Sequence, residues 1–161
     1  MQSIIIETKR GSILVREAMI SDAEQFRALR LEALQDSPTA FPVDYTVNLN
    51  HPVSFWENRL KSDEDGTIFF AEHQNRLVGM TGIRKGESPK TKHNATIWGV
   101  YVSPESRGLR IAESLIEACI SWANSRDVII VKLGVTAAST SAVRCYQRCG
   151  FIIYGTEPRG I

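Results

Sequence analysis

The segment from Arg107 to Ala112 joins a short loop containing Gly108 to a long amphipathic helix. A loop that opens directly onto a helix presents unpaired backbone N–H groups at the positive end of the helix dipole. Proteins bind phosphate groups in this way, so we expect a phosphorylated ligand at this loop. The predicted binding residues are Arg107, Gly108, Leu109, Arg110, Ile111 and Ala112.

A strand is predicted before this loop and another after the helix. The first is Ala95–Val102, with Gly99 in its middle, and the second is Val128–Thr136, with Gly134 near its end. A strand, a crossover helix and a further strand form a parallel unit. Glycine inside a strand often marks a bulge or the close approach of a ligand, so we expect irregular strands at both glycines.

The rest of the chain alternates between strands and helices. The capping pattern Ser21-x-x-Glu24 begins a predicted helix that ends before Ser37-Pro38, because a residue preceding proline avoids the α region. The other predicted elements are the strands Ile13–Arg16, Thr67–Glu72, Leu77–Arg84 and Phe151–Tyr154, the hairpin turn Gln74-Asn75, the helices Pro52–Leu60 and Ser141–Cys149, the loop Lys85–Asn94 and the helix cap Gly150.

This order of elements indicates an α/β fold of the α+β type, with a central mixed sheet, mostly antiparallel, flanked by helices. The chain has 161 residues, which is enough to bury a sizeable core. We therefore expect residues 1–161 to form a single domain.

Composition and charge exclude several classes of partner. Hydrophobic residues make up 43% of the chain and charged residues 23%, and the formal net charge is +1. This balance argues against broad attraction to nucleic acid or to a membrane. The N-terminal sequence MQSIIIETKRGS has neither the apolar length of a spanning helix nor that of a signal peptide. We expect a cytoplasmic protein with no nucleic-acid or membrane partner.

The three cysteines are Cys119, Cys145 and Cys149, and an odd count suits a reducing compartment. Cys145 and Cys149 are four residues apart, so they share a helix face and a metal pair is conceivable. No CxxC motif or histidine lies nearby, however, so buried thiols are the preferred interpretation. We expect no metal.

The predicted phosphate loop resembles the acyl-CoA loop of the GNAT (GCN5-related N-acetyltransferase) superfamily. That loop has Arg or Gln, two residues, Gly, one residue, and then Gly or Ala. Arg107 and Ala112 match its two ends, whereas Arg110 replaces the central glycine. Gly108 occupies a position that is frequently glycine in relatives.

A second motif also resembles this superfamily, whose members have Asn-x-x-Ala-x-x-Leu-Tyr-x-x-x-Gly-Phe. Here it reads Ser139-x-x-Ala142-x-x-Cys145-Tyr146-x-x-x-Gly150-Phe151. The order of elements from about Ile13 to Gly155 is also the GNAT order, and the chain resembles uncharacterised bacterial members. Relatives usually continue beyond the position of Ile161 into another strand. We therefore expect either a truncated C-terminal strand or a sheet edge covered by a partner subunit in a homodimer.

The resemblance implies that acetyl-CoA is the cosubstrate. It implies that the backbone of Tyr101 and Val102 pairs with the pantetheine arm, and that the N–H groups from Arg107 to Ala112 hold the pyrophosphate. Ser139 stands where relatives often have an asparagine that bonds the cofactor chain. The position of Tyr146 is that of the general acid, which protonates the departing sulfur.

Acetyl transfer to an amine also needs a group that takes the amine's proton. Several relatives carry a catalytic carboxylate in the strand that corresponds to Ala95–Val102, but this strand has neither Asp nor Glu. His93 precedes it and has an ordinary pKa suited to accepting a proton near neutrality, so we predict His93 as the base. Glu32, Glu72 and a chain of water molecules are the alternatives.

Three functions remain open from the sequence. The leading hypothesis is an acetyl-CoA-dependent N-acetyltransferase acting on a primary amine of a small molecule by direct attack in a ternary complex. The second is acetylation of a protein N-terminus or lysine, which the near-neutral charge does not separate from the first. The third is a non-catalytic acyl-CoA-binding regulatory domain, favoured by Arg110, Ser139 and the missing carboxylate.

Overall fold

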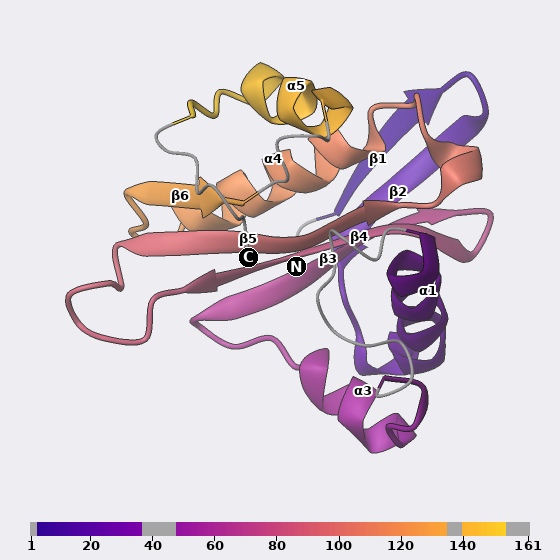
Figure 1. The fold of residues 1–161 in the computed structure, drawn as a ribbon, viewed down its shortest axis with the longest axis horizontal. Helices are drawn as coiled ribbons and strands as arrows, with labels where there is room; N and C mark the ends of the chain where they lie inside the picture. Colours follow the sequence, from indigo (N-terminus) through magenta and orange to yellow (C-terminus); the bar gives the residue numbers. More distant parts are fainter. Residues whose placement is uncertain (1–2, 37–47, 135–139, 154–161) are drawn as a thin grey trace.

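A six-stranded sheet runs through the molecule in the order β1-β2-β3-β4-β5-β6 (Figure 1). The computed structural model describes residues 3–36, 48–134 and 140–153. Neighbouring strands from β1 to β5 are antiparallel, and β5 and β6 are parallel, which confirms the predicted mixed sheet. The strands are β1 (Ser3–Thr8), β2 (Gly11–Glu17), β3 (Gly66–His73), β4 (Arg76–Lys85), β5 (Asn94–Val102) and β6 (Ile130–Leu133).

Helices cover both faces of the sheet, so the predicted α/β fold is confirmed. In Figure 1, α4 (Ile111–Asn124) and α5 (Thr140–Arg148) lie on one face, and α1 (Ala23–Asp36) and α3 (Val53–Arg59) lie on the other. Short 3₁₀ turns at Ile20–Asp22 and Pro104–Ser106 lead into α1 and into the loop before α4. None of the described helices combines the length and the apolar composition that crossing a membrane requires.

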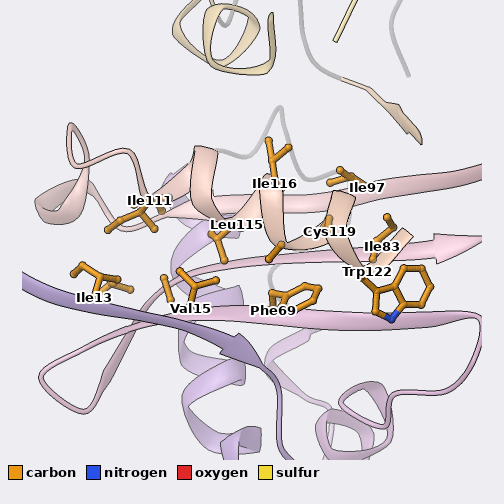
Figure 2. Packing of buried hydrophobic residues seen from close by; sticks show 14 of the residues in the cluster. Ile13, Val15, Phe69, Ile83, Ile97, Ile111, Leu115, Ile116, Cys119 and Trp122 are labelled. Carbon is orange, nitrogen blue, oxygen red and sulfur yellow. The ribbon is translucent and has the colours of Figure 1, made fainter. Parts of the chain in front are cut away.

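Two cores hold these layers together. Figure 2 shows the first, in which Leu115, Cys119 and Trp122 of α4 lie on the side of the helix that faces Phe69, while Ile116 of the same cluster points away from Phe69. Leu115, Cys119 and Trp122 belong to the apolar face of the helix, whose period of 3.6 residues directs them to one side. In the second core, the ring of Phe26 packs edge-on against Trp56 with centroids 5.4 Å apart, and it also contacts Phe70. The sheet thus separates the crossover helix α4 from the α1–α3 pair.

Local sequence signals account for the predicted turns. Gln74 and Asn75 have positive φ angles of 52° and 64°, the conformation that joins two antiparallel strands without opposing their twist. Gly150 has φ of 98° and ends α5, with the N–H of Phe151 donating to the carbonyl of Tyr146 at 3.1 Å. The predicted β3–β4 hairpin and the predicted glycine cap are both confirmed.

Two elements differ from the expectations. β1 was not expected. It contains three consecutive isoleucines and, among the described residues, it pairs with β2 alone, at the edge of the sheet. The strand predicted over Phe151–Tyr154 is wrong for residues 151–153, where Ile152 is 85% exposed and no ladder forms. A short apolar run is therefore insufficient for a strand unless a neighbouring strand supplies hydrogen bonds.

A buried ion network ties the start of α1 to the sheet. Arg16 of β2 donates to both carboxylate oxygens of Asp22, at 2.8 and 2.9 Å, and to Glu72 of β3 at 3.0 Å. Asp22 also accepts the backbone N–H of Met19 at 2.8 Å, so Asp22 supplies the cap that the sequence had assigned to Ser21. Burial alone would raise the pKa of Asp22, but the hydrogen bonds from Arg16 and Met19 outweigh it and lower that pKa.

We expect Asp22→Ala to lower the free energy of unfolding by about 3 kcal/mol, because it leaves a buried guanidinium with one carboxylate fewer. The exposed pair Arg84–Asp63, at 3.7 Å, provides the matched control. Asp63→Ala should cost less than about 1 kcal/mol. Urea unfolding measures both, and equal losses would contradict the assigned role of the network.

The same network predicts a pH dependence. The pKa of Asp22 is lower in the folded state, so the stability that Asp22 contributes is complete above the ordinary aspartate pKa. That contribution is lost as pH falls through the folded-state value. The parent protein should therefore be more stable than Asp22→Ala at neutral pH, and this difference in the free energy of unfolding should become smaller as pH falls into the acid range.

Candidate active site

β5 contains a bulge at the middle of the molecule. Met80 lies opposite Tyr101 and Gly82 opposite Trp98, so two residues of β5 face the single residue Thr81 of β4. Gly99 within this bulge has φ of 65°, a conformation that glycine adopts readily. The bulge that the sequence predicted at Gly99 is confirmed, and it bends β5 as the strand approaches the loop before α4.

The second half of β5 has an edge that β6 does not cover. The described β5–β6 ladder runs from Asn94↔Ile130 to Ile97↔Leu133. On the opposite side, the N–H of Ser103 donates to the carbonyl of Val78 in β4 at 2.8 Å. Because successive residues of a strand direct their N–H and C=O groups to opposite sides, Val102 directs its backbone away from β4. Val102 therefore presents polar backbone groups at this edge.

The backbone of Tyr101 lies differently, because Tyr101 is two residues before Ser103 and therefore directs its N–H and C=O groups toward β4, where it lies opposite Met80. The ladder favours Val102, and not Tyr101, as the residue whose backbone is available to a ligand. The side chain of Tyr101 is 4% exposed and packs in the second core, on the α1 side of the sheet.

The loop before α4 is anchored on both sides of Arg110. Leu109 and Ile111 are buried in the first core, whereas Arg110 is exposed. Arg110 adopts the left-handed conformation, with φ of 63° and ψ of 25°, which explains why relatives of this loop have glycine there. The carbonyl of Arg110 accepts the N–H of Ser114 at 3.2 Å. The N–H groups of the first turn of α4 precede this bond and have no carbonyl one turn earlier.

Arg107 connects the end of β5 to α1. Its Nε donates to the carbonyl of Val102 at 3.0 Å, and its Nη2 donates to the carboxylate of Asp36 at 2.6 Å. The guanidinium also lies 5.7 Å from the ring centroid of Tyr101. The side chain is therefore engaged with β5 and α1, while Gly108, with φ of 83°, turns the backbone toward the loop.

Glu32 of α1 accepts hydrogen bonds from two hydroxyl groups near the end of β5. Its Oε2 accepts the hydroxyl of Tyr101 at 2.9 Å and that of Ser103 at 2.6 Å. Burial and the hydrogen bond to Glu32 raise the pKa of Tyr101 well above its usual value. Tyr101 therefore stays protonated and remains a hydrogen-bond donor to Glu32.

Tyr146 lies on α5 and packs against the first core, with its ring 6.5 Å from that of Phe151. Burial, followed by the neighbouring thiols of Cys145 and Cys149, raises the pKa of Tyr146 to about 12. The phenol is therefore protonated at neutral pH and holds a proton to donate. Ser139, the other residue predicted from this motif, lies outside the described residues.

The structure separates His93 and Glu72 from these groups. His93 is exposed at the start of β5, where its carbonyl accepts the N–H of Ile129 at 2.7 Å. At roughly 3.3 Å per residue, β5 carries the chain about 26 Å from Asn94 to Val102. The placement therefore does not favour His93 as the base. Glu72 belongs to the Arg16 network, so among the predicted carboxylates Glu32 alone lies beside Tyr101.

Two arginines beside the bulge were not predicted. Nη1 of Arg30 in α1 lies 3.2 Å from where a Cβ on Gly99 would stand, and the Arg59 guanidinium lies 5.9 Å from the ring centroid of Trp98. A signal for Arg30 exists in the sequence. Arg30 follows Phe26 by four residues, so it lies on the apolar face of α1, where a charge is unusual.

The described cysteines fit buried thiols better than a metal site. Cys119 and Cys145 are buried and Cys149 is half-buried. Burial raises the pKa of Cys119 to about 12 and that of Cys149 to about 11, which disfavours the thiolate that a metal requires. No group of three or more His, Cys, Asp or Glu side chains that could hold a metal occurs in the described part of the chain.

A family model and several known proteins match this chain. The family model described as acetyltransferase (GNAT) family matches residues 23–151. The chain is 34% identical over 97 residues to streptothricin acetyltransferase of Escherichia coli, covering 60% of this chain and 53% of that protein. It is 27% identical over 139 residues to mycothiol acetyltransferase of Brachybacterium faecium, covering 84% of this chain and 39% of that protein. The chain thus spans about half or less of the length of these two relatives.

A solved structure has the same fold. The GNAT-family acetyltransferase of Streptococcus pneumoniae superposes with a TM-score of 0.82 at 21% identity, covering 92% of this chain and 90% of that one. At this identity the likeness concerns the fold, which is that of the sheet and helices described above.

The strained loop gives a prediction. Arg110→Gly removes a left-handed cost of about 1–2 kcal/mol and adds unfolded-chain entropy worth about 0.4–1 kcal/mol. We therefore expect the free energy of unfolding to rise by roughly 0.5–1 kcal/mol. Arg110→Lys, which keeps the charge and the strain, is the control and should leave stability unchanged. Denaturant unfolding checks this, and a destabilised Gly variant would contradict it.

Proposed function

The chain belongs to the GNAT acetyltransferase family, and from its site we propose that it transfers the acetyl group of acetyl-CoA to a primary amine of a small molecule. The observation that carries this proposal is the edge of β5 at Val102, which lies beyond the end of the described β5–β6 ladder and leads from the bulge at Gly99 to the first turn of α4. The edge of β5 offers backbone hydrogen-bonding groups, and the N-terminus of α4, where this edge leads, offers the positive end of a helix dipole.

The residues present fit the cosubstrate. Val102 would hold the pantetheine arm through its N–H and its carbonyl, which has a second lone pair beside the one that accepts Arg107. The N–H groups of the loop and of the first turn of α4 would hold the pyrophosphate, because Leu109 and Ile111 fix their direction by burial. Bound acetyl-CoA supplies the thioester whose acetyl carbon is attacked by the amine.

Two side chains handle the protons in this proposal. Tyr146 donates its phenolic proton to the departing thiolate as the carbon–sulfur bond breaks and the carbon–nitrogen bond forms. Its raised pKa of about 12, caused by burial and by the adjacent thiols, keeps this proton in place until the thiolate develops. Glu32 takes up the proton released by the amine through solvent, because it is the predicted carboxylate that lies beside Tyr101 and Ser103.

The relatives support a small-molecule acceptor over a protein. Streptothricin acetyltransferase and mycothiol acetyltransferase are both named for low-molecular-mass compounds.

Acetyl-CoA should stabilise the folded protein by about 2.7 kcal/mol at one hundred times Kd, and less at high salt, because its phosphates bind a helix terminus by charge. A thermal-shift titration measures this. If acetyl-CoA, CoA and desulfo-CoA all leave Tm unchanged, the site does not bind the cosubstrate.

Thiol release from acetyl-CoA with a panel of primary amines then tests transfer. We expect amine-dependent release of CoA and an acetylated product of matching mass. Binding of acetyl-CoA with no amine-dependent release would instead support the non-catalytic regulatory function.

Tyr146→Phe keeps the packed ring and removes the hydroxyl, so stability and acetyl-CoA affinity should barely change. Loss of the general acid should lower kcat by about 10²- to 10⁴-fold while KM for acetyl-CoA moves little. Single-turnover rates are the measurement, because slow product release would mask the effect in kcat. A folded variant with an unchanged single-turnover rate would assign Tyr146 to the core alone.

A further inference from the structure

Two arginine side chains from different helices converge on the bulge of β5. Arg30 extends from α1 until its Nη1 lies 3.2 Å from the Cβ position of Gly99. Arg59 comes from the last turn of α3, and its guanidinium lies 5.5 Å from the ring centroid of Phe55 and 5.9 Å from that of Trp98. Trp98 precedes Gly99 directly and packs over Gly82 on the same α1–α3 side of the sheet. Both cations thus lie near the adjacent residues Trp98 and Gly99 of the bulged strand.

This arrangement concentrates positive charge in a partly dehydrated place. Burial, together with the charge of Arg59, lowers the pKa of Arg30 to about 10, and burial lowers the pKa of Arg59 as well. Both side chains remain cationic at neutral pH and repel each other. Arg59 takes part in none of the ion pairs among the described residues. An anion beside the two guanidinium groups would lower the free-energy cost of holding two like charges near each other.

The two arginines lie where the acceptor would bind, and not where the phosphates of the cosubstrate would bind. The phosphates belong at the first turn of α4, beyond Val102, at the end of β5. Gly99 lies about 10 Å back along the strand from Val102. In the proposed function the thioester reaches this part of the edge, so a group bound by Arg30 and Arg59 lies beside the reacting carbon.

We propose that the acceptor is an amine carrying a carboxylate, and that Arg30 and Arg59 bind this carboxylate while the amine faces the bulge at Gly99. The inference rests on the proposed function, because it places the reacting thioester beside this bulge. A guanidinium presents two parallel N–H donors that match the two oxygens of a carboxylate. The ring of Trp98 gives the acceptor an apolar surface beside the two cations.

Pairs of acceptors that differ only in charge test the proposal. Each α-amino acid in a panel is compared with its carboxamide, which keeps the amine and removes the negative charge. We expect kcat/KM of the acids to exceed that of the amides, and Arg59→Gln to lower it for the acids alone, by about 10- to 100-fold, the range of a lost charge-assisted hydrogen bond. Arg30→Gln should act in the same direction.

Arg126→Gln is the matched control. Arg126 also lies over a tryptophan, 4.5 Å from the ring centroid of Trp122, but at the far end of α4 from the loop. This variant should leave both members of each acceptor pair unchanged. If the amides are used as well as the acids, or if Arg59→Gln weakens acids and amides alike, the proposal is overturned.

A binding measurement separates this inference from the proposed function. Each acid and its amide are titrated by calorimetry into the complex of the protein with CoA, which needs no turnover. Tighter binding of the acid that is lost in Arg59→Gln supports the anion site even if no amine is acetylated. Equal binding of acid and amide overturns the anion site even if amine-dependent transfer is found.

Discussion

The end of the described β5–β6 ladder at Ile97 is the constraint on which the site depends. β5 keeps its ladder with β4 through Val102, whereas the bulge at Gly99 bends it where the described ladder with β6 ends. A strand edge inside a packed layer leaves polar backbone groups that cost about 1–3 kcal/mol each when unsatisfied. Here Nε of Arg107 donates to the carbonyl of Val102 and meets part of that requirement. The same geometry that leaves the edge open thus suits it to a ligand with amide groups.

The loop that follows adds a second constraint. Leu109 and Ile111 are both buried, and the residue between them must turn the chain from the strand into α4. Arg110 makes this turn by adopting a left-handed conformation, and its side chain is exposed to solvent. The direction of the N–H groups is therefore set by two apolar anchors and survives the loss of the central glycine. This explains how the loop retains its shape while departing from the family pattern.

Sequence reasoning succeeded where the signal was local. Positive φ at Asn75 and Gly99 follows from residue types that tolerate it, and the apolar period of α4 predicted its buried face. The contacts of Tyr101 with Glu32 and of Arg107 with Asp36 join residues about seventy positions apart. No local sequence pattern predicts these contacts, because they depend on how α1 packs on the sheet. His93 was predicted as the base because it precedes β5 and has an ordinary pKa near neutrality, but it lies at the opposite end of β5 from Val102.

The arginine pair also bears on the missing carboxylate of β5. An ammonium group beside two guanidinium groups is disfavoured by like charge, so its pKa falls and the neutral amine becomes more abundant. A carboxylate on the acceptor would bind the pair and hold the amine near the bulge, where part of that repulsion persists. The phosphates of the cosubstrate lie more than about 10 Å away along β5, beyond the screening length of about 8 Å at physiological salt. Under this proposal the positive field at Gly99 assists deprotonation of the acceptor, and Glu32 needs only to take up a proton that the amine already releases readily.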